Sequence, residues 1–196
     1  MRGELILDVS VSLDGYSAGP DDDVERLHDW LYGLTAWRQR HDRTGGQSNR
    51  DAELVEEAWQ STGAIVMGRR TFDSGEEPWG DDPPFRVPCF VLTHRTRAAL
   101  RKGETTFTFV TDGIESALEQ ARAAAGDKHV GVMGANAAQQ YLRAGLLDEI
   151  QLHIVPVLLG GGIRLFDQLG DEPIELERTG VIDSPRVTHL RFRVAK

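Results

Sequence analysis

Four short segments hold most of the residues that could do chemistry in this sequence, and each follows a predicted strand. They are residues 10–15, 67–72, 92–95 and 133–136. In open α/β sheets, ligands bind beyond the carboxyl ends of the strands, so the four segments are expected to meet at one site. Each segment alone is more often a turn than a site, but their joint occurrence favours a binding site.

An anionic nucleotide is the ligand that these segments would suit. Gly134 and the small Ala135 allow close approach of a backbone, and the free N–H groups of a helix capped by Asn136 would face a phosphate. A further phosphate could be held by guanidinium groups and hydroxyl donors, namely Arg69, Arg70, Arg95, Thr71 and Thr93. The net charge of −9 does not forbid this, because surface charge is screened beyond about 8 Å, whereas each charged hydrogen bond contributes about 1.5–3 kcal/mol.

Other kinds of catalytic site lack their motifs. The histidines form no H-x-x-x-H pair and the one cysteine has no cysteine partner, so no metal site is predicted. There is no G-x-S-x-G elbow, no P-loop lysine after residues 160–162, and no G-x-G-x-x-G fingerprint. His153 lies between Leu152 and Ile154, and we interpret it as an ordinary residue on the polar face of a strand.

The elements that would position the segments follow from hydrophobic periodicity. Alternation of apolar and polar residues predicts a strand over residues 4–12. Further strands are predicted at 64–67, 89–92, 107–110, 129–133 and 149–159, mostly from continuous apolar runs. Two further strands are predicted around a turn at Ser184-Pro185. Strands that alternate with helices indicate a mostly parallel sheet, here finished by an antiparallel C-terminal pair.

Three capping patterns predict helix starts: Asp22 with Glu25, which opens a helix from about Val24, Asp112 with Glu115, and Asn136 with Gln139. A further short helix is predicted over residues 52–61. Residues 38–50 are polar and predict a mobile loop, which is either a substrate lid or a linker.

Composition predicts one domain over residues 1–196, since 40 % of the residues are hydrophobic and 27 % are charged. The acidic balance argues against nucleic acid or an anionic membrane as the main partner. Asp8 interrupts the first apolar run, which is not expected of a signal peptide, and no stretch approaches the ~20 apolar residues of a membrane span. A single cysteine, Cys89, excludes an internal disulfide and fits a cytoplasmic location.

Longer motifs then carry a family resemblance. They are Ser12-Leu13-Asp14-Gly15, residues 67–72, residues 144–150, and residues 155–162 followed by Leu165-Phe166. In this order, and over nearly the whole chain, they resemble the dihydrofolate reductase-like family, in particular the branch built on the RibD C-terminal domain. Pro83-Pro84-Phe85 leading into residues 90–95 is similar to bacterial deaminase/reductase members. The resemblance implies a three-layer fold with a mostly parallel central sheet.

The resemblance also implies an NADPH-dependent reductase of a small heterocyclic substrate, folate/pterin-like or pyrimidine-like, that pairs as a homodimer through its late strands. By motif, it places Gly68, Arg69 and Thr71 at the adenosine side of the cofactor and Thr93, His94 and Arg95 at the 2′-phosphate. It places the pyrophosphate under Gly134, Ala135, Asn136 and Ala137, and the nicotinamide near Val11 and Ser12.

The proton donor is expected to be a carboxylate, because hydride transfer to an imine needs a proton at nitrogen and dihydrofolate reductases use a carboxylate on their first helix. The candidates are Asp29 on the first predicted helix, which we favour, and Asp14 near its approach. An exposed helix carboxylate is the alternative interpretation of Asp29.

Two departures from the family bear on the substrate and cofactor. Dihydrofolate reductases carry Gly-Gly where this chain has Met133-Gly134, and the riboflavin enzymes carry a substrate-binding Glu near the place of Val132. The absence of this Glu argues against a ribosylaminopyrimidine substrate. Two alternative functions stay open, a non-catalytic nucleotide-binding module and a 5-amino-6-(5-phosphoribosylamino)uracil reductase of riboflavin biosynthesis.

Overall fold

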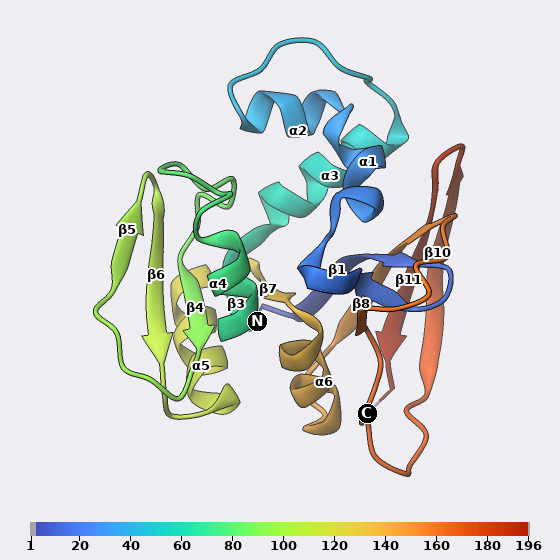
Figure 1. Cartoon of the computed structure of the whole chain (residues 1–196). Helices are drawn as coiled ribbons and strands as arrows, with labels where there is room; N and C mark the ends of the chain where they lie inside the picture. Colours follow the sequence, from blue (N-terminus) through green and yellow to red (C-terminus); the bar gives the residue numbers. More distant parts are fainter. Residues whose placement is uncertain (1–2, 196) are drawn as a thin grey trace.

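A nine-stranded mixed sheet forms the centre of the molecule, and helices cover both of its faces (Figure 1). The computed structural model describes residues 3–195. Across the sheet the strand order is β10-β11-β8-β1-β7-β3-β4-β6-β5. The strands are β1 (Leu5–Ser12), β3 (Thr62–Gly68), β4 (Cys89–Leu92), β5 (Leu100–Lys102), β6 (Thr105–Val110), β7 (His129–Met133), β8 (Glu149–Val155), β10 (Leu176–Ser184) and β11 (Val187–Val194).

The directions of the strands confirm the predicted sheet. The six strands β8, β1, β7, β3, β4 and β6 run parallel to one another. β11 is antiparallel to both β8 and β10, and β5 is antiparallel to β6. A small second sheet pairs β2 (Tyr16–Ala18) with β9 (Ile163–Arg164). The strand predicted over 149–159 ends at Val155, because Pro156 has no N–H to continue the ladder.

The helices are α1 (Glu25–Tyr32), α2 (Thr35–Arg40), α3 (Arg50–Ser61), α4 (Arg69–Gly75), α5 (Ile114–Ala125) and α6 (Ala135–Arg143), with a 3-10 turn η1 (Pro20–Asp22) before α1. The loop predicted over residues 38–50 is therefore shorter, since its first residues belong to α2. The rest of it is held by backbone hydrogen bonds between Thr35 and Gln47 (3.0 Å) and between Gln47 and Gly33 (2.8 Å).

The three predicted capping patterns are wrong. Gly113 (φ 96°) and Gly134 (φ 93°) precede α5 and α6, and no side chain caps either helix. The chain enters both helices with a positive φ, which glycine adopts most readily. Asn136 lies inside α6, where its Oδ1 accepts from Gln140. Asp22 lies in η1 and its carboxylate pairs with Arg70.

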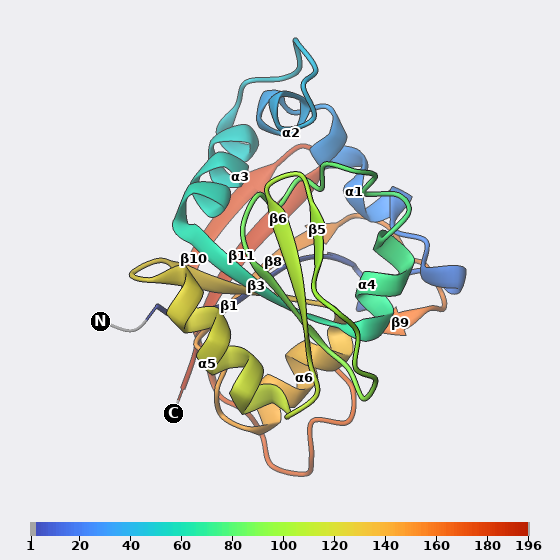
Figure 2. The same cartoon turned by 90° about the vertical axis from the view of Figure 1, so that its left-hand side faces the viewer.

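The two faces of β1 explain how the sheet positions a site. Leu5, Leu7 and Val11 are buried in the core beneath α5 and α6. Side chains alternate along a strand, so Asp8 and Ser10 point to the opposite face. On that side α1, α2 and α3 stand over one part of the sheet, as the turned view of Figure 2 shows. Among residues 3–195, no helix is long and apolar enough to cross a membrane.

Candidate functional site

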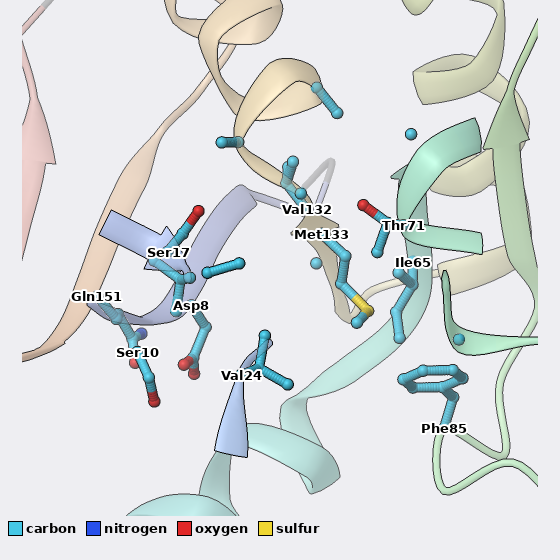
Figure 3. A pocket seen from close by; sticks show the side chains of 18 of the residues that line it. Asp8, Ser10, Ser17, Val24, Ile65, Thr71, Phe85, Val132, Met133 and Gln151 are labelled. Atoms are coloured by element: carbon cyan, nitrogen blue, oxygen red, sulfur yellow. The ribbon is translucent and has the colours of Figure 1, made fainter. Parts of the chain in front are cut away.

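A cleft of about 1650 Å³ runs along this polar face and over the carboxyl ends of β3, β4, β6 and β7. Figure 3 shows Asp8, Ser10 and Gln151 on one wall, with Thr71 and Met133 on the other side of the opening. The cleft is larger than the 300–1,000 Å³ that small-molecule sites commonly occupy. It therefore has room for an extended ligand together with a second small molecule.

The cleft brings together ten of the twelve residues predicted to bind a cofactor. They are Gly68, Arg69, Thr71, Thr93, His94, Arg95, Gly134, Ala135, Asn136 and Ala137. The four post-strand segments of the sequence thus contribute to one cavity, although the first does so through Ser10 alone.

Val11 and Ser12 do not line the cleft, and their expected place near a nicotinamide stays a prediction. Val11 is buried on the far face of β1. Ser12 is buried at the end of the strand, where its hydroxyl donates to Asp14 Oδ1 (2.6 Å). Asp8 and Ser10 of the same strand face the cleft instead.

Close packing of the turn between β7 and α6 against the Thr71 side chain of α4 requires glycine at position 134. A Cβ added to Gly134 would lie 2.2 Å from Oγ1 of Thr71. Gly134 also has a positive φ, which is strained for residues with a side chain. The N-terminal turn of α6, with its unpaired N–H groups, consequently opens directly onto the cleft.

Arg95 is the guanidinium that is available for an anion. Arg69 is paired with Asp73 (2.7 Å) and Arg70 with Asp22 (2.7 Å). Within residues 3–195, no carboxylate oxygen lies within 4.0 Å of the Arg95 guanidinium. The Arg95 backbone N–H donates to Thr93 Oγ1 (3.1 Å), which fixes the loop that carries both residues into the cleft.

Neither predicted proton donor lines the cleft. Asp29 is exposed on α1. Asp14 accepts hydrogen bonds from the Ser12 hydroxyl and from the backbone N–H groups of Gly160 (2.7 Å) and Leu159 (3.1 Å). These bonds, that of Ser12 first, lower the pKa of Asp14 to about 2. Asp14 thus ties the turn after β1 to the segment after β8, and its predicted catalytic role, like that of Asp29, finds no support in the geometry.

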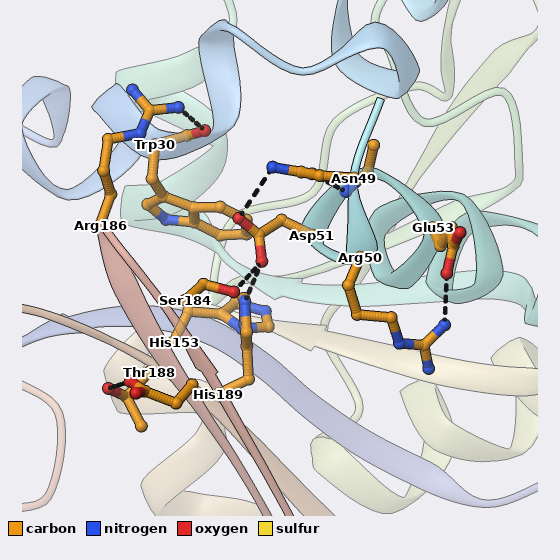
Figure 4. Close-up of polar contacts among 12 residues, drawn as sticks. Trp30, Asn49, Arg50, Asp51, Glu53, His153, Ser184, Arg186, Thr188 and His189 are labelled. Carbon is orange, nitrogen blue, oxygen red and sulfur yellow. Dashed lines mark hydrogen bonds and ion pairs between the residues drawn. The ribbon is translucent and has the colours of Figure 1, made fainter. Parts of the chain in front are cut away.

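The sequence interpretation missed a hydrogen-bonded series of four side chains at the β1 end of the cleft. His153 Nε2 lies 2.6 Å from Asp8 Oδ1, and His153 Nδ1 lies 2.7 Å from Nδ1 of His189. His189 Nε2 in turn lies 3.1 Å from Oδ1 of the buried Asp51. Figure 4 shows Asp51 where it accepts from His189, Ser184 and Asn49. We call Asp8, His153, His189 and Asp51 the carboxylate–histidine series.

Two members of the series, Asp8 and His189, have shifted pKa values. Desolvation raises the pKa of Asp8, but attraction to His153 and the hydrogen bond from it prevail, so the net direction is downward. Desolvation lowers the pKa of His189, and the neighbouring His153 adds to this. His28 of α1 faces the same end of the cleft, and desolvation, followed by repulsion from His153, lowers the pKa of His28 to about 4.

His28 is expected to make the protein less stable in acid. Because its pKa is lower in the folded state than the ordinary 6.5, the unfolded chain binds more protons, and stability is lost as pH falls from 6.5 towards 4. At pH 4.5 the loss amounts to about 2–3 kcal/mol. Urea unfolding of His28→Gln at pH 7 and pH 4.5 measures it. The variant should lose less stability over this interval than wild type, whereas the exposed control His94→Gln should lose as much.

The fold and cleft together define an α/β protein of the dihydrofolate reductase-like type, with a long cleft along the carboxyl ends of its parallel strands. More narrowly, the chain belongs to the RibD C-terminal domain family, whose model matches residues 4–190.

Relatives in this family are distant in sequence. The Bacillus subtilis protein YwjB, itself uncharacterised, is 23 % identical over 172 residues, which cover 88 % of this chain and 87 % of YwjB. A solved structure from Shewanella sp. PV-4, which its name connects with riboflavin biosynthesis, is 23 % identical, with a TM-score of 0.77 over 100 % of both chains. The Thermotoga maritima diaminohydroxyphosphoribosylaminopyrimidine deaminase/5-amino-6-(5-phosphoribosylamino)uracil reductase is 14 % identical, with a TM-score of 0.69 over 99 % of this chain and 57 % of that one. These likenesses establish the fold.

Proposed function

We propose that the protein is an NADPH-dependent reductase that transfers hydride to a small heterocyclic substrate of the folate/pterin or pyrimidine kind. The observation that carries the proposal is the cleft itself. Arg95, which has no carboxylate partner, Gly134, which has no Cβ, and the N-terminus of α6 all face this one continuous space. Membership of the RibD C-terminal domain family supports the same class of reaction.

The residues present fit a dinucleotide with an extra phosphate. A pyrophosphate would lie against residues 134–137, where the Cβ-free Gly134 leaves the N–H groups of α6 accessible. Arg95, with the Thr93 hydroxyl beside it, would hold a 2′-phosphate by charged hydrogen bonds. When bound, the dihydronicotinamide supplies hydride, and the end of the cleft lined by Asp8, Ser10 and Gln151 is left for the substrate.

Titration with NADPH, NADH and NADP⁺ tests the proposal directly. Trp30, Trp37, Trp59 and Trp79 all line the cleft, so quenching of tryptophan emission should report binding. We expect NADPH to bind more tightly than NADH, and thermal shift to rank the nucleotides in the same order. If no nicotinamide nucleotide binds at millimolar concentration, the reductase proposal is wrong and the protein uses the cleft for another ligand.

Family membership favours a second candidate, the 5-amino-6-(5-phosphoribosylamino)uracil reductase activity that the Thermotoga protein's name includes. Complementation of a strain that lacks this step distinguishes the two functions. Growth without added riboflavin would establish the second candidate, and failure to grow with a soluble, NADPH-binding protein would leave the broader reductase.

We also propose a cytoplasmic homodimer. Support for the dimer comes from two large apolar side chains on adjacent segments, Leu13 (66 % exposed) and Leu158 (70 % exposed), which a backbone hydrogen bond from Leu13 to Val157 joins. The buried thiol of Cys89, which has no cysteine partner, fits a reducing compartment.

Leu158→Asp is expected to convert the dimer into a monomer, because it would place a charge in the apolar contact. Sedimentation velocity at several concentrations measures the change. Circular dichroism should be unaltered, since Leu158 is exposed in the single chain. A wild-type protein that sediments as a monomer at high concentration would refute the dimer.

A further inference from the structure

We propose that the carboxylate–histidine series is a proton relay, in which His153 stores a proton next to the cleft and Asp8 passes it to the substrate that accepts hydride. The inference rests on the proposed function and assigns its proton source. It replaces Asp29 and Asp14, which the fold keeps out of the cleft.

The fold connects the four side chains in a line rather than around a point. The register pairs Ser10 of β1 with His153 of β8, and His153 with His189 of β11. Asp51 comes from α3, which lies over this face of the sheet. Among residues 3–195, no group of three or more His, Cys, Asp or Glu side chains is placed to hold a metal ion. The linear arrangement therefore suits a proton held on His153 and passed to Asp8 at the cleft, with Asp51 orienting His189 at the other end.

Counting hydrogens shows how many protons the series holds. Three contacts of 2.6, 2.7 and 3.1 Å join the four side chains, and each needs one hydrogen. Ionised carboxylates donate none, and two neutral imidazoles supply only two N–H groups. Three hydrogen bonds between ionised carboxylates therefore require one imidazolium and one neutral imidazole, which is one stored proton.

The environment assigns that proton to His153. The lowered pKa of His189 keeps its ring neutral, with its one hydrogen on Nε2, where it donates to Asp51. His189 Nδ1 is then an acceptor, so His153 donates from Nδ1 to His189 and from Nε2 to Asp8. Trp30 packs against both rings, with centroids 5.0 Å from His153 and 5.3 Å from His189, and this fixes their positions.

Three other titratable or charged groups among residues 3–195 face this end of the cleft. They are Glu25 and His28 of α1 and Arg191 of β11, which pairs with Glu149 of β8. His28 is neutral near pH 7, because its pKa is about 4. Arg191 lies 3.4 Å from Glu149 and keeps its proton, and it contributes to the lowered pKa of Asp8.

Hydride and proton would reach the two ends of one double bond of the substrate. The hydride, which a bound dihydronicotinamide would supply, would add to the electrophilic carbon of a C=N or C=O bond, and the π electrons of that bond would move to the heteroatom. The heteroatom takes a proton from the Asp8 carboxyl, which Asp8 has received from His153 Nε2. The products are the reduced CH–NH or CH–OH compound, the oxidised nicotinamide, ionised Asp8 and a neutral His153. A proton from water then restores the imidazolium.

Histidine ¹⁵N NMR of the full chain without any ligand tests the relay independently of reductase activity. At pH 7 we expect His153 protonated on both nitrogens, His189 protonated on Nε2 only, and a ¹⁵N–¹⁵N coupling across the Nδ1–Nδ1 hydrogen bond. In Asp8→Asn the His153 signals should become those of a neutral ring, whereas His129→Gln should change neither residue. A neutral His153 in the wild type, or the absence of the coupling, would overturn the relay even if Asp8→Asn failed to fold.

Kinetics with an acceptor that the wild type reduces tests the use of the stored proton. Asp8→Asn should lower kcat about 10²- to 10⁴-fold, the range of general acid catalysis, with NADPH affinity changed less than twofold. Asp51→Asn should shift the pH profile of kcat while KM stays the same, because Asp51 positions His189 and does not touch the substrate. Wild-type kcat in Asp8→Asn would overturn the proton role, whereas failure of NADPH to bind would refute the proposed function and leave the NMR result standing.

Discussion

Replacement of Arg95 by glutamine is expected to weaken NADPH binding about 10- to 100-fold and to leave NADH binding unchanged. The guanidinium has no carboxylate partner within 4.0 Å in the described chain and lines the cleft. It is therefore free to make charged hydrogen bonds to a 2′-phosphate, each of which contributes about 1.5–3 kcal/mol. Fluorescence titration of both nucleotides at two salt concentrations measures the loss, which should shrink at high salt.

Arg97 provides the matched control two residues further along the same loop. Its guanidinium is paired with Glu76 at 2.6 Å, lies over the Phe72 ring, and does not line the cleft. Arg97→Gln should therefore leave the ratio of NADPH to NADH affinity unaltered. If both variants lose NADPH affinity equally, a general change in charge explains the effect and Arg95 is not the 2′-phosphate contact.

The central strands could be predicted from the sequence because they are apolar, and β3 and β4 are largely buried on both faces. Apolar runs such as residues 89–92 and 129–133 match β4 and β7 residue for residue, since a parallel strand between two helical layers has little room for polar side chains. β5 was missed because the edge strand Leu100–Lys102 is short and largely polar.

The meeting of the segments that follow the strands in one cleft could be predicted for a similar reason. Gly68, Thr93 and Gly134 each come directly at or after a strand end, and parallel strands bring those ends to one edge of the sheet. The capping patterns failed because they consider neighbours in sequence only. At Gly134 the conformation follows from the approach of Thr71, which lies 63 residues away in the chain.

The carboxylate–histidine series had no local signal. Residues 8, 51, 153 and 189 meet only through the strand order β1-β8-β11 and the placement of α3. Alternation did predict that Asp8 and His153 lie on polar faces. Alternation could not show that Asp8 and His153 lie on the same face of the sheet, because the packing of the whole domain decides the strand order.

Gly134→Ala is expected to destabilise the protein by about 2–5 kcal/mol and to abolish nucleotide binding in whatever remains folded. The new methyl group would lie 2.2 Å from Thr71 Oγ1, so the Thr71 side chain or the turn before α6 must shift. Overpacking of this kind costs about 1–3 kcal/mol, and the φ of +93° adds a strain of about 1–2 kcal/mol. Urea unfolding and NADPH titration measure the two effects.

Gly126→Ala separates the strain of a positive φ from the clash. Gly126 has a φ of +63°, and an added Cβ would meet nothing within 4 Å, so this variant should lose about 1–3 kcal/mol through backbone strain alone and keep its affinity for NADPH. In the double variant Gly134→Ala/Thr71→Ala the nearest clashing atom is gone, so part of the stability lost in Gly134→Ala should return, which makes the two substitutions non-additive. Strict additivity would mean that the contact with Thr71 does not contribute to the stability lost in Gly134→Ala. The loss would then come from backbone strain alone.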